Sequence, residues 1–550
     1  MRILTANRIS SNTAIIPVVI TILCLVPFVG KAFHIDDILF IWVAEQIQMS
    51  PADFYRFSVN WDGIERPMSQ VTKNPPVASY YVALIALLFG WSEIVLHSAF
   101  LIPAAAMSLG TYYLGKELCS RPVLAAMAAV FTPGFLVSST NIMCDTMMLA
   151  FWVWAVFLWV QGMKTNNQLS LFLAAVLLSL SALTKYFGMA PLGLLFVYSF
   201  MKARKPGTWL VFLFIPVIIL VGYQWLTHEL YGRGLLLDAT SYATQIKWDG
   251  SAAFFSEGLT GLTFVGGCVS TALFYGLRLW SRNVLIGGAV LTISIIFVFA
   301  YAGKIGGFTI HDADGVKWSF LVQFSLMVVT GVSILGLAVT DFWESRDTDS
   351  LMLLLWVIGT FIFVSFINWT VNARSVLPMV PAVGILIMRR IDHRGKGKQK
   401  VPVWRVAWPL IPAVILALSA CWADYTLAGS ARLAAKTIHD KFENNQNTTW
   451  FQGHWGFQYY MEAMGGIAYD FRDTRPVSGD KIIIPLNNTN IKPLRKSRMD
   501  LIEVVDIVPS RWMTTMYSPL GAGFYADIWG PLPFAFGLVG SEKYYVLMVK

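Results

Sequence analysis

Five charged residues stand at the ends of long apolar segments, where an ionisable side chain is costly unless it has a partner or a function. Asp36 and Asp37 are neighbours in "FHIDDILFIW", just beyond the first apolar run. Asp145 opens a later run in "NIMCDTMMLAFWVW", Lys185 interrupts apolar sequence in "LTKYFG", and Arg374 stands in "NARSVLPMV". Three carboxylates and two cations could perform acid–base chemistry on an anionic substrate. Simpler explanations remain open, because an aspartate can cap a helix and a lysine can extend its amine to the membrane interface.

The elements that must position these residues are membrane spans. The chain has 550 residues, of which 56% are hydrophobic and 13% charged, against ~25% charged in a typical soluble domain. Apolar runs long enough to cross a hydrocarbon core of about 30 Å recur along most of the chain. The sequence therefore predicts a polytopic α-helical membrane protein with about thirteen spans: 13–30, 94–115, 122–139, 145–161, 169–183, 187–201, 208–226, 259–280, 283–302, 318–340, 351–368, 374–389 and 402–421.

Charge decides that one further apolar run, 75–90, does not cross. Lysine and arginine favour the cytoplasmic side of short loops. If 75–90 is interfacial or re-entrant, then Arg2, Lys116, Lys202 and the basic run 389–400 all fall on the cytoplasmic side. The net charge of +9 is then a consequence of topology. Because the cations are spread over several loops, no nucleic-acid partner is expected.

This topology predicts two domains. Residues 1–421 form the membrane domain, in which 31–93 is a long outer loop, and 422–550 form a soluble α/β domain with strand-like runs such as "DKIIIPL" and "YYVLMV". An odd number of spans places this second domain outside the cytoplasm. The five charged residues are predicted to lie on the same outer side.

Several motifs, taken in order, resemble those of the membrane-embedded (GT-C type) polyprenyl-phosphate-sugar glycosyltransferases. They are the acidic pair, "NPPVASYYVALIALLFGWSE", the aspartate that opens the fourth span, "LTKYFGMAPL", "NARSVLPMVPAVGIL" and "GHWGFQYYMEAMGG". The family includes bacterial lipid A aminoarabinose transferases and protein O-mannosyltransferases, and the resemblance covers most of 30–200 with short patches near 374 and 454. It implies a sugar donor on an isoprenoid phosphate and a lipid, glycan or protein acceptor. It also implies a bacterial inner membrane with the active site on the periplasmic side.

The resemblance also implies roles for individual residues. Asp36 matches the catalytic, acceptor-activating carboxylate with Asp37 in support, Asp145 matches a second carboxylate, and Lys185 and Arg374 match the residues that hold the donor phosphate. Further candidates for substrate contacts are Lys73, Asn74, Tyr80 and Arg233.

Two positions depart from the family pattern. Asn74 stands where a lysine often precedes the proline, with Lys73 one residue earlier, and Ser375 follows Arg374 where tyrosine is common. The identity of donor and acceptor is therefore not transferred from the family.

The chemistry of glycosyl transfer agrees with these roles. A carboxylate can accept the proton of an attacking hydroxyl, and cations can stabilise the departing phosphate. One displacement with a carboxylate base inverts the anomeric carbon. A divalent ion held by Asp36 and Asp37 is an alternative use of the same pair, with no cofactor otherwise expected. A transporter or flippase of lipid-linked saccharides is the competing class, but it would place charges near the midplane in repeated halves, and the sequence shows no repeat.

Overall fold

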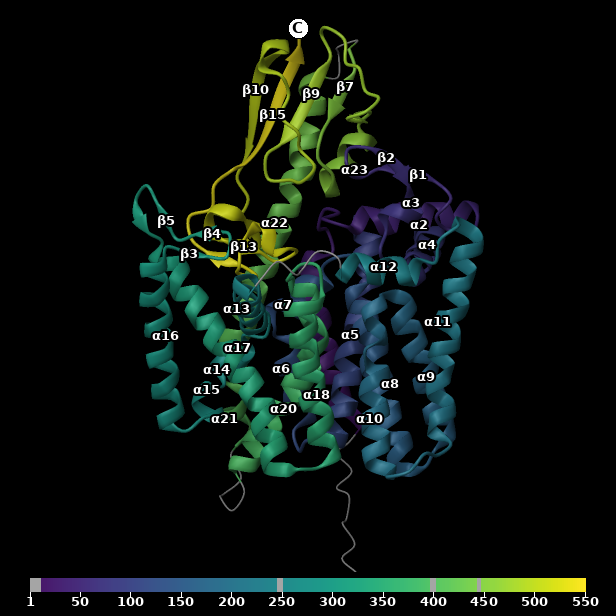
Figure 1. Ribbon diagram of the computed structural model, residues 1–550, viewed down its shortest axis with the longest axis vertical. Helices are drawn as coiled ribbons and strands as arrows, with labels where there is room; N and C mark the ends of the chain where they lie inside the picture. Colours follow the sequence, from purple (N-terminus) through teal and green to yellow (C-terminus); the bar gives the residue numbers. More distant parts are fainter. Residues whose placement is uncertain (1–10, 245–250, 396–401, 443–446) are drawn as a thin grey trace, which may run out of the picture.

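The computed structural model describes residues 11–244, 251–395, 402–442 and 447–550. Arg2 and the end of the basic run 389–400 lie outside this part of the chain. Most of the described chain is a helical bundle, capped at one end by a smaller domain that contains a β-sheet (Figure 1). The long helices of the bundle are α1 (Ile15–Leu25), α5 (Glu93–Leu118), α8 (Asp145–Thr165), α9 (Gln168–Thr184), α10 (Pro191–Ala203), α11 (Trp209–Tyr231), α13 (Ser251–Cys268), α16 (Arg282–Ala302), α17 (Trp318–Ser345), α18 (Thr348–Ile362), α20 (Val380–Arg394) and α22 (Leu410–Phe442).

Within the described residues, eight helical segments are long and apolar enough to cross a membrane. A ninth span results if α6 (Pro122–Val130) and α7 (Pro133–Ser139) are counted as one, although they are bent by 67°. Shorter apolar helices account for two more predicted spans, at α1 and α9. The multi-pass helical class is thus confirmed, whereas the number thirteen stays a prediction.

Besides 122–139, two further predicted spans are broken in the structure. The segment 259–280 ends its main helix at Cys268 and continues as the short helices α14 (Thr271–Phe274) and α15 (Gly276–Leu279). The segment 374–389 begins as α19 (Ala373–Val376), passes through a 3₁₀ turn at Leu377–Met379 and only then enters α20. Proline explains the second break, because Pro378 and Pro381 lack a backbone N–H and disfavour helix before them.

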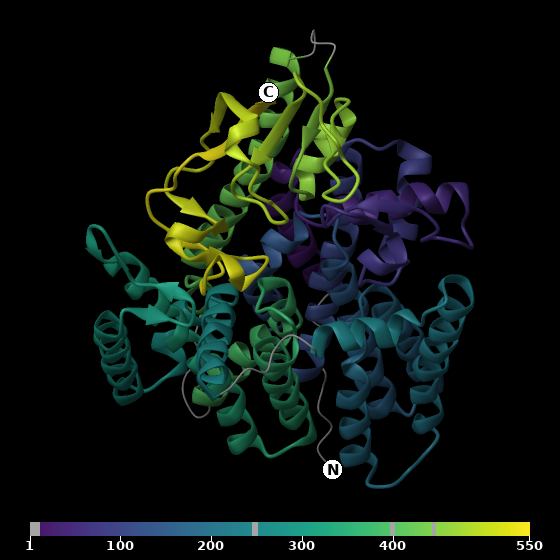
Figure 2. The ribbon, with the colours of Figure 1, turned by 45° about the horizontal axis from the view of Figure 1, so that its top comes forward.

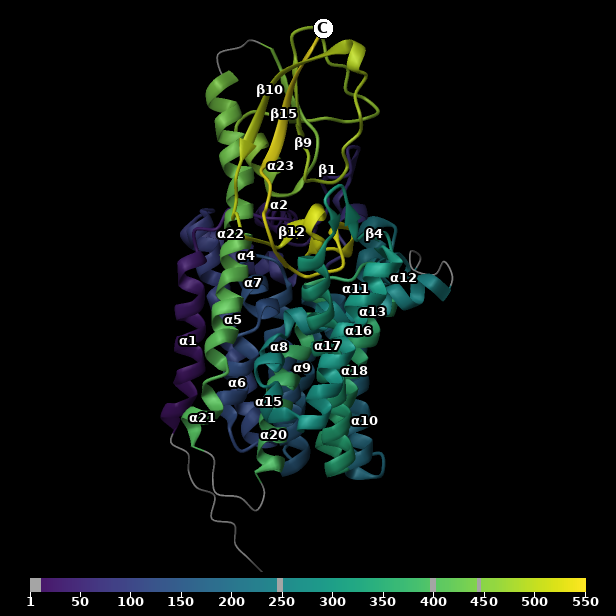
Figure 3. The ribbon, with the colours of Figure 1, turned by 90° about the vertical axis from the view of Figure 1, so that its left-hand side faces the viewer.

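Short helices gather at the end of the bundle that faces the sheet. These are α2 (Asp37–Met49), α3 (Met68–Val71), α4 (Val77–Phe89) and α12 (Leu235–Thr244), as Figures 1 and 3 show. The helix α4 is the apolar run predicted not to cross. Its 13 residues span about 20 Å, which is less than a hydrocarbon core of about 30 Å.

The smaller domain is built on a five-stranded sheet. The strand order is β10-β15-β9-β7-β8, with β10, β15 and β9 antiparallel and β7 parallel to both of its neighbours. Every residue of β9 is buried, because the strand is central and has side chains packed on both faces. The strands are β7 (Thr449–Phe451), β8 (Ile467–Ala468), β9 (Lys481–Pro485), β10 (Met499–Ile507) and β15 (Glu542–Val549), and α23 (Trp455–Ala463) follows β7.

Two features join this domain to the bundle. Helix α22 runs without a break from the bundle to the sheet (Figure 3), so the predicted domain boundary at 421/422 falls inside one helix. The segment after β10 also folds back over the bundle (Figure 2). There the Phe524 carbonyl accepts a hydrogen bond from the Ala373 backbone N–H at 2.8 Å, and the Val371 carbonyl accepts one from Asp527 at 3.0 Å. The chain on either side of α19 is therefore fixed by residues from the C-terminal domain.

Candidate active site

The structure brings four of the five predicted charged residues into one cluster. Arg374 Nη1 donates to Asp36 Oδ2 at 2.9 Å and lies 4.0 Å from Asp145 Oδ2. Lys185 Nζ donates to the other oxygen of Asp145 at 2.5 Å. Carboxylates and cations therefore alternate in the order Asp36, Arg374, Asp145, Lys185. We call these four residues the charged cluster.

Each member of the cluster stands where a helix begins or ends. Asp145 is the first residue of α8, and Lys185 is the extended residue at which α9 stops. Arg374 lies in the single turn of α19. Asn372 is the N-cap of this turn, and its side-chain oxygen accepts a hydrogen bond from the Ser375 N–H at 2.9 Å. Helix ends place side chains at the mouth of a bundle. The middle segments of the long helices therefore stay apolar, as a membrane span requires.

The cluster is partly open and its hydrogen bonding is incomplete. The side chain of Asp145 is only 1% exposed, whereas those of Asp36, Lys185 and Arg374 are 22%, 20% and 15% exposed. Among the described residues, Asp145 Oδ2 and Arg374 Nε are buried without a hydrogen-bond partner. Most buried polar atoms in proteins have a partner. The cluster thus keeps a donor on Arg374 available for a further group.

Asp37 does not join the cluster. Its carboxylate is fully buried, with Oδ2 accepting from the His34 N–H and Oδ1 from the Ile142 N–H, both at 2.9 Å. Burial raises the pKa of Asp37 to about 7, although these two hydrogen bonds and nearby Lys31 favour the ionised form. Asp36 precedes α2 as its N-cap residue, but its side chain makes no capping hydrogen bond. The two neighbouring aspartates therefore differ: Asp37 ties the first outer loop to the bundle, and Asp36 faces Arg374.

The four residues predicted to contact substrate occupy three different places. Lys73 donates to Asp238 at 2.8 Å, and Arg233 pairs with the same carboxylate. Asn74 lies beside the start of α8, where its Oδ1 accepts from Cys144 Sγ at 3.6 Å.

Tyr80 lies elsewhere, on α4. Its hydroxyl donates to the Pro51 carbonyl, and its side chain is otherwise exposed. None of these four residues forms a hydrogen bond with the charged cluster.

A second group of polar residues was not predicted. Lys31 is completely buried, and its amine donates to Asp424 Oδ2 at 2.5 Å, Asn141 Oδ1 at 2.6 Å and Thr140 Oγ1 at 3.2 Å. Asp424 also accepts from the hydroxyls of Thr515 at 2.7 Å and Tyr525 at 2.8 Å. We call this the Lys31–Asp424 network.

The sequence does carry a signal for this network. Lys31 and Asp424 are single charges directly after predicted apolar spans, which is the criterion that found the charged cluster.

Tyr525 connects the two groups. Its ring lies 5.8 Å from the Arg374 guanidinium, within the range of a cation–π contact. Its hydroxyl accepts from Asn141 at 3.0 Å besides donating to Asp424. Since Tyr525 belongs to the C-terminal domain, that domain contributes a residue to the mouth of the bundle.

A divalent ion fits this arrangement poorly. Both Asp37 oxygens already accept backbone N–H groups, and Asp36 faces a guanidinium. Among the described residues, no group of three or more His, Cys, Asp or Glu side chains is arranged to hold a metal. The alternative use of Asp36 and Asp37 as metal ligands stays a prediction, and no step below depends on it.

Comparisons with known proteins agree with this architecture. Residues 73–225 match the family model described as dolichyl-phosphate-mannose-protein mannosyltransferase. The structure of ArnT from Cupriavidus metallidurans bound to undecaprenyl phosphate is similar over 87% of this chain and 94% of its own, with 12% identity and a TM-score of 0.53. An Archaeoglobus fulgidus oligosaccharyltransferase tethered with an acceptor peptide is similar over 83% of this chain and 63% of its own, with 15% identity and a TM-score of 0.49. No curated protein matches the sequence. The family-model match over residues 73–225 and the ArnT-like fold confirm the predicted resemblance to the GT-C polyprenyl-phosphate-sugar glycosyltransferases. The fold class, a multi-pass helical membrane protein with a sheet-containing C-terminal domain, is confirmed as well.

Proposed function

We propose that this chain, which has the fold of a GT-C glycosyltransferase, transfers a hexose or pentose from a polyprenyl phosphate to an acceptor at the outer face of a membrane. The observation that carries the proposal is the charged cluster. Two carboxylates and two cations meet at the mouth of an apolar bundle, and one buried Arg374 donor has no partner among the described residues. A lipid-linked anion can reach such a mouth from the bilayer. The acceptor class comprises lipids such as lipid A, glycans and proteins.

Exposure distinguishes the roles of the two carboxylates in the cluster. Asp145 is almost fully buried and holds Lys185 and Arg374 in place, so it has no open side from which to approach an acceptor. Asp36 keeps 22% of its side chain exposed. We therefore assign Asp36 as the general base, with Asp145 and Asp37 as positioning residues.

The reaction is a single displacement. The acceptor hydroxyl gives its proton to Asp36, and its oxygen forms a bond to the anomeric carbon as the bond from that carbon to the phosphate oxygen breaks. The electron pair of the broken bond leaves with the polyprenyl phosphate. Lys185 and Arg374 stabilise this negative charge at a site where little water competes. Attack from the side opposite the phosphate inverts the anomeric configuration.

Localisation is part of the same proposal. We place the protein in a bacterial inner membrane, with the charged cluster and the C-terminal domain on the periplasmic side. Within the membrane domain, the loops that carry most of the lysine and arginine residues then lie in the cytoplasm. Access of a cysteine-specific, membrane-impermeant reagent to single cysteines placed in the C-terminal domain and in a basic loop would test this orientation.

The decisive experiment is transfer by Asp36→Asn. The purified protein is incubated in nanodiscs with radiolabelled undecaprenyl-phosphate sugars and a membrane extract. We expect the variant to insert normally and to lose about 10²- to 10⁴-fold in rate, the usual contribution of a general base. Asp62→Asn is the matched control, because Asp62 is 44% exposed and lies outside the cluster.

Three results would contradict the proposal in different ways. A wild-type rate for Asp36→Asn removes the base assignment alone. Retention of the anomeric configuration in the product excludes the single displacement. If every donor stays intact while labelled lipid changes leaflets, the protein is a flippase and not a transferase.

A further inference from the structure

The motif "GHWGFQYYMEAMGG" has no place in the charged cluster, although it is one of the motifs that mark this chain. It spans residues 453–466 and so contains the whole of α23 in the C-terminal domain. The structure places this helix against the first outer loop at two points, residues 60–61 and residues 33–34. The helix therefore contacts the loop that carries Asp36.

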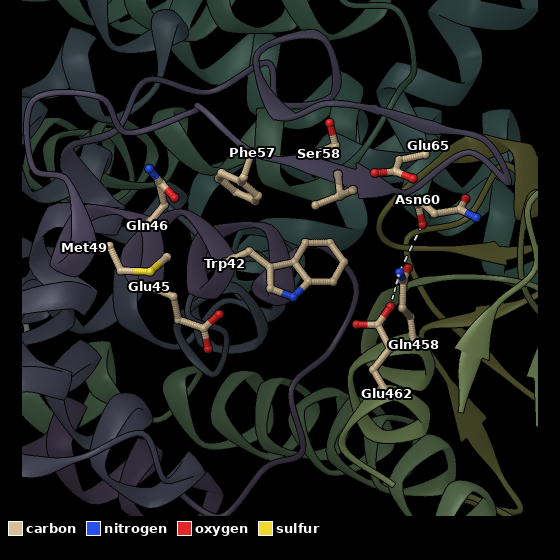
Figure 4. Close-up of a pocket in the computed structure, with 11 residues that line it drawn as sticks. Trp42, Glu45, Gln46, Met49, Phe57, Ser58, Asn60, Glu65, Gln458 and Glu462 are labelled. Atoms are coloured by element: carbon tan, nitrogen blue, oxygen red, sulfur yellow. Dashed lines mark hydrogen bonds between the residues drawn. The ribbon is translucent and has the colours of Figure 1, made fainter. Parts of the chain in front are cut away.

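The first contact consists of hydrogen bonds to backbone carbonyls. Gln458 Nε2 donates to the Asn60 carbonyl at 3.0 Å, as Figure 4 shows. Burial lowers the pKa of His454 to about 4, so its ring is neutral. Because a carbonyl can only accept, Nδ1 of this ring donates to the Trp61 carbonyl at 2.9 Å, and Nε2 accepts from the Thr489 hydroxyl at 2.5 Å. This part of the loop is thereby fixed to the C-terminal domain.

The second contact fixes the backbone of Phe33, which is 1% exposed. The Phe33 N–H donates to the Tyr460 hydroxyl at 2.8 Å. The same hydroxyl donates to Glu93, the first residue of α5, and Glu93 pairs with Arg432 of α22. Tyr460 thus connects the loop backbone to an ion pair between two long helices, and the position of its hydroxyl is set from both sides.

Gly456 shows how closely α23 approaches the same residue. A Cβ atom at Gly456 would lie 1.9 Å from the Phe33 carbonyl oxygen and 3.5 Å from the Cα of His34. Any larger residue would therefore push the backbone of the loop away from the helix. Both the N–H and the carbonyl of Phe33 are thus in contact with α23.

The turn that carries the general base has a strained backbone. The Asp37 N–H donates to the His34 carbonyl at 3.1 Å and closes a turn over Ile35 and Asp36. Ile35 has φ +47° although it is β-branched and 3% exposed, and a positive φ at the first central residue of a turn is normally adopted by glycine. Strain of this kind persists only where the surrounding structure holds it. The result is that Asp36 points toward Arg374.

We propose that α23 positions the general base, with Tyr460 as a positioning residue for Asp36. This inference rests on the proposed function, because it requires Asp36 to act as the base. The helix holds residues 33–34 from the side of the C-terminal domain, and Asp37 holds the turn from the side of the bundle. Held at both ends, the turn keeps Asp36 beside Arg374. A displacement of about 1 Å in a catalytic group can lower a rate by about a hundredfold.

Tyr460→Phe tests the inference, because it removes the hydroxyl and keeps the ring. In the transfer assay we expect kcat to fall about tenfold, and the KM for the polyprenyl-phosphate donor to stay within about twofold of wild type, since Lys185 and Arg374 still hold the phosphate. Tyr459→Phe is the matched control. The Tyr459 ring also packs on Phe33, at 4.9 Å, but its hydroxyl makes no hydrogen bond within the described parts of the chain. This variant should keep both constants.

A double-mutant cycle separates positioning from a purely structural role. If Tyr460 acts through Asp36, then adding Tyr460→Phe to Asp36→Asn should change the residual rate by less than about twofold, because no base is left to position. An equal loss in both backgrounds, or a wild-type kcat for Tyr460→Phe alone, would overturn the inference. A wild-type rate for Asp36→Asn would instead remove the base assignment of the proposed function, so the two failures are distinguishable.

Gly456→Ala displaces the same backbone in a second way. Its methyl group would collide with the Phe33 carbonyl, so we expect kcat per folded protein to fall at least about tenfold with little change in the donor KM. Gly429→Ala on α22 is the control, because a Cβ atom there meets no other atom within 4 Å. If Tyr460→Phe does not fold, the cycle with Asp36→Asn is run with Gly456→Ala. A wild-type kcat for Gly456→Ala would show that α23 does not position the base.

Discussion

The charged cluster and the Lys31–Asp424 network are built from the same residue types but differ in completeness. In the network, the side chains of Lys31 and Asp424 are 0% exposed, and hydroxyl and amide groups supply further hydrogen bonds to both. In the cluster, three of four side chains are partly exposed, and Arg374 Nε and Asp145 Oδ2 lack partners among the described residues. An ion pair whose polar atoms all have hydrogen-bond partners cannot bind a substrate, whereas an ion pair with unpartnered polar atoms can. This contrast supports the proposal that the network has a structural role and the cluster a chemical one.

Removing one charge from the network should have the largest effect on stability. Lys31→Met leaves Asp424 ionised and buried, which costs about 3–5 kcal/mol when one partner of a buried pair is lost. We expect a markedly lower unfolding temperature of the purified protein in detergent, measured by intrinsic fluorescence. Asp36→Asn should leave the same temperature almost unchanged, since Asp36 is partly exposed.

A double variant sharpens this result. Lys31→Met combined with Asp424→Asn removes both charges, so part of the lost stability should return. If Lys31→Met unfolds at the wild-type temperature, the network is not the structural element that its burial indicates.

The second effect is the pH dependence of stability, which should come from Asp37 and not from Asp36. Burial raises the pKa of Asp37 from 3.8 to about 7, so the folded protein binds a proton that the unfolded chain releases in this range. Stability from this group is therefore full below pH 4 and is lost as the pH rises to about 7, by up to about 4 kcal/mol. Unfolding temperatures of wild type and Asp37→Asn, compared between pH 4.5 and 8, should show a steeper fall for the wild type. Parallel curves would contradict the prediction.

The third effect concerns binding of the polyprenyl-phosphate donor by Arg374 in the charged cluster. Arg374→Lys keeps the positive charge but removes the Nε donor and the planar guanidinium. Loss of one hydrogen bond to a charged group costs about 1.5–3 kcal/mol, which corresponds to a loss of about ten- to a hundredfold in kcat/KM for the polyprenyl-phosphate donor. Arg472→Lys, at an exposed position in the C-terminal domain, is the control. Wild-type kinetics for Arg374→Lys would show that the N–H of Arg374 Nε does not bind the donor phosphate.

The residues of the charged cluster could be predicted from the sequence. The physical reasons why the rest of the site could not be predicted are specific. Asp36, Asp145, Lys185 and Arg374 were recognisable because a charge in apolar sequence is costly. Adjacent residues point in different directions, so no pattern could decide which of Asp36 and Asp37 faces the cluster. That choice depends on the backbone N–H of Ile142, which lies more than 100 residues away in the chain.

The fold was predicted in class but not in detail. The apolar runs gave the helical membrane domain and the strand-like runs gave the sheet. Hydropathy does not register the breaks after Cys268 and at Leu377–Met379, because a broken span keeps its apolar composition. The Lys31–Asp424 network was missed although each of its charges follows a predicted span, because the sequence does not show that these two residues meet. Pairing of residues 393 positions apart is a property of the tertiary structure, and α22 continues past the predicted end of the last span.

The smallest effect tests the residue that both regions share. Tyr525→Phe removes the hydroxyl that bonds to Asp424 and Asn141 but keeps the ring beside Arg374. We expect a loss of about 1 kcal/mol in stability and a transfer rate within about twofold of wild type. Tyr525→Leu removes the ring as well, so it should also lower the transfer rate, because the cation–π contact helps to orient the guanidinium. If both variants lose stability and activity in the same proportion, the network and the cluster act as one unit, and their separation into structure and chemistry is wrong.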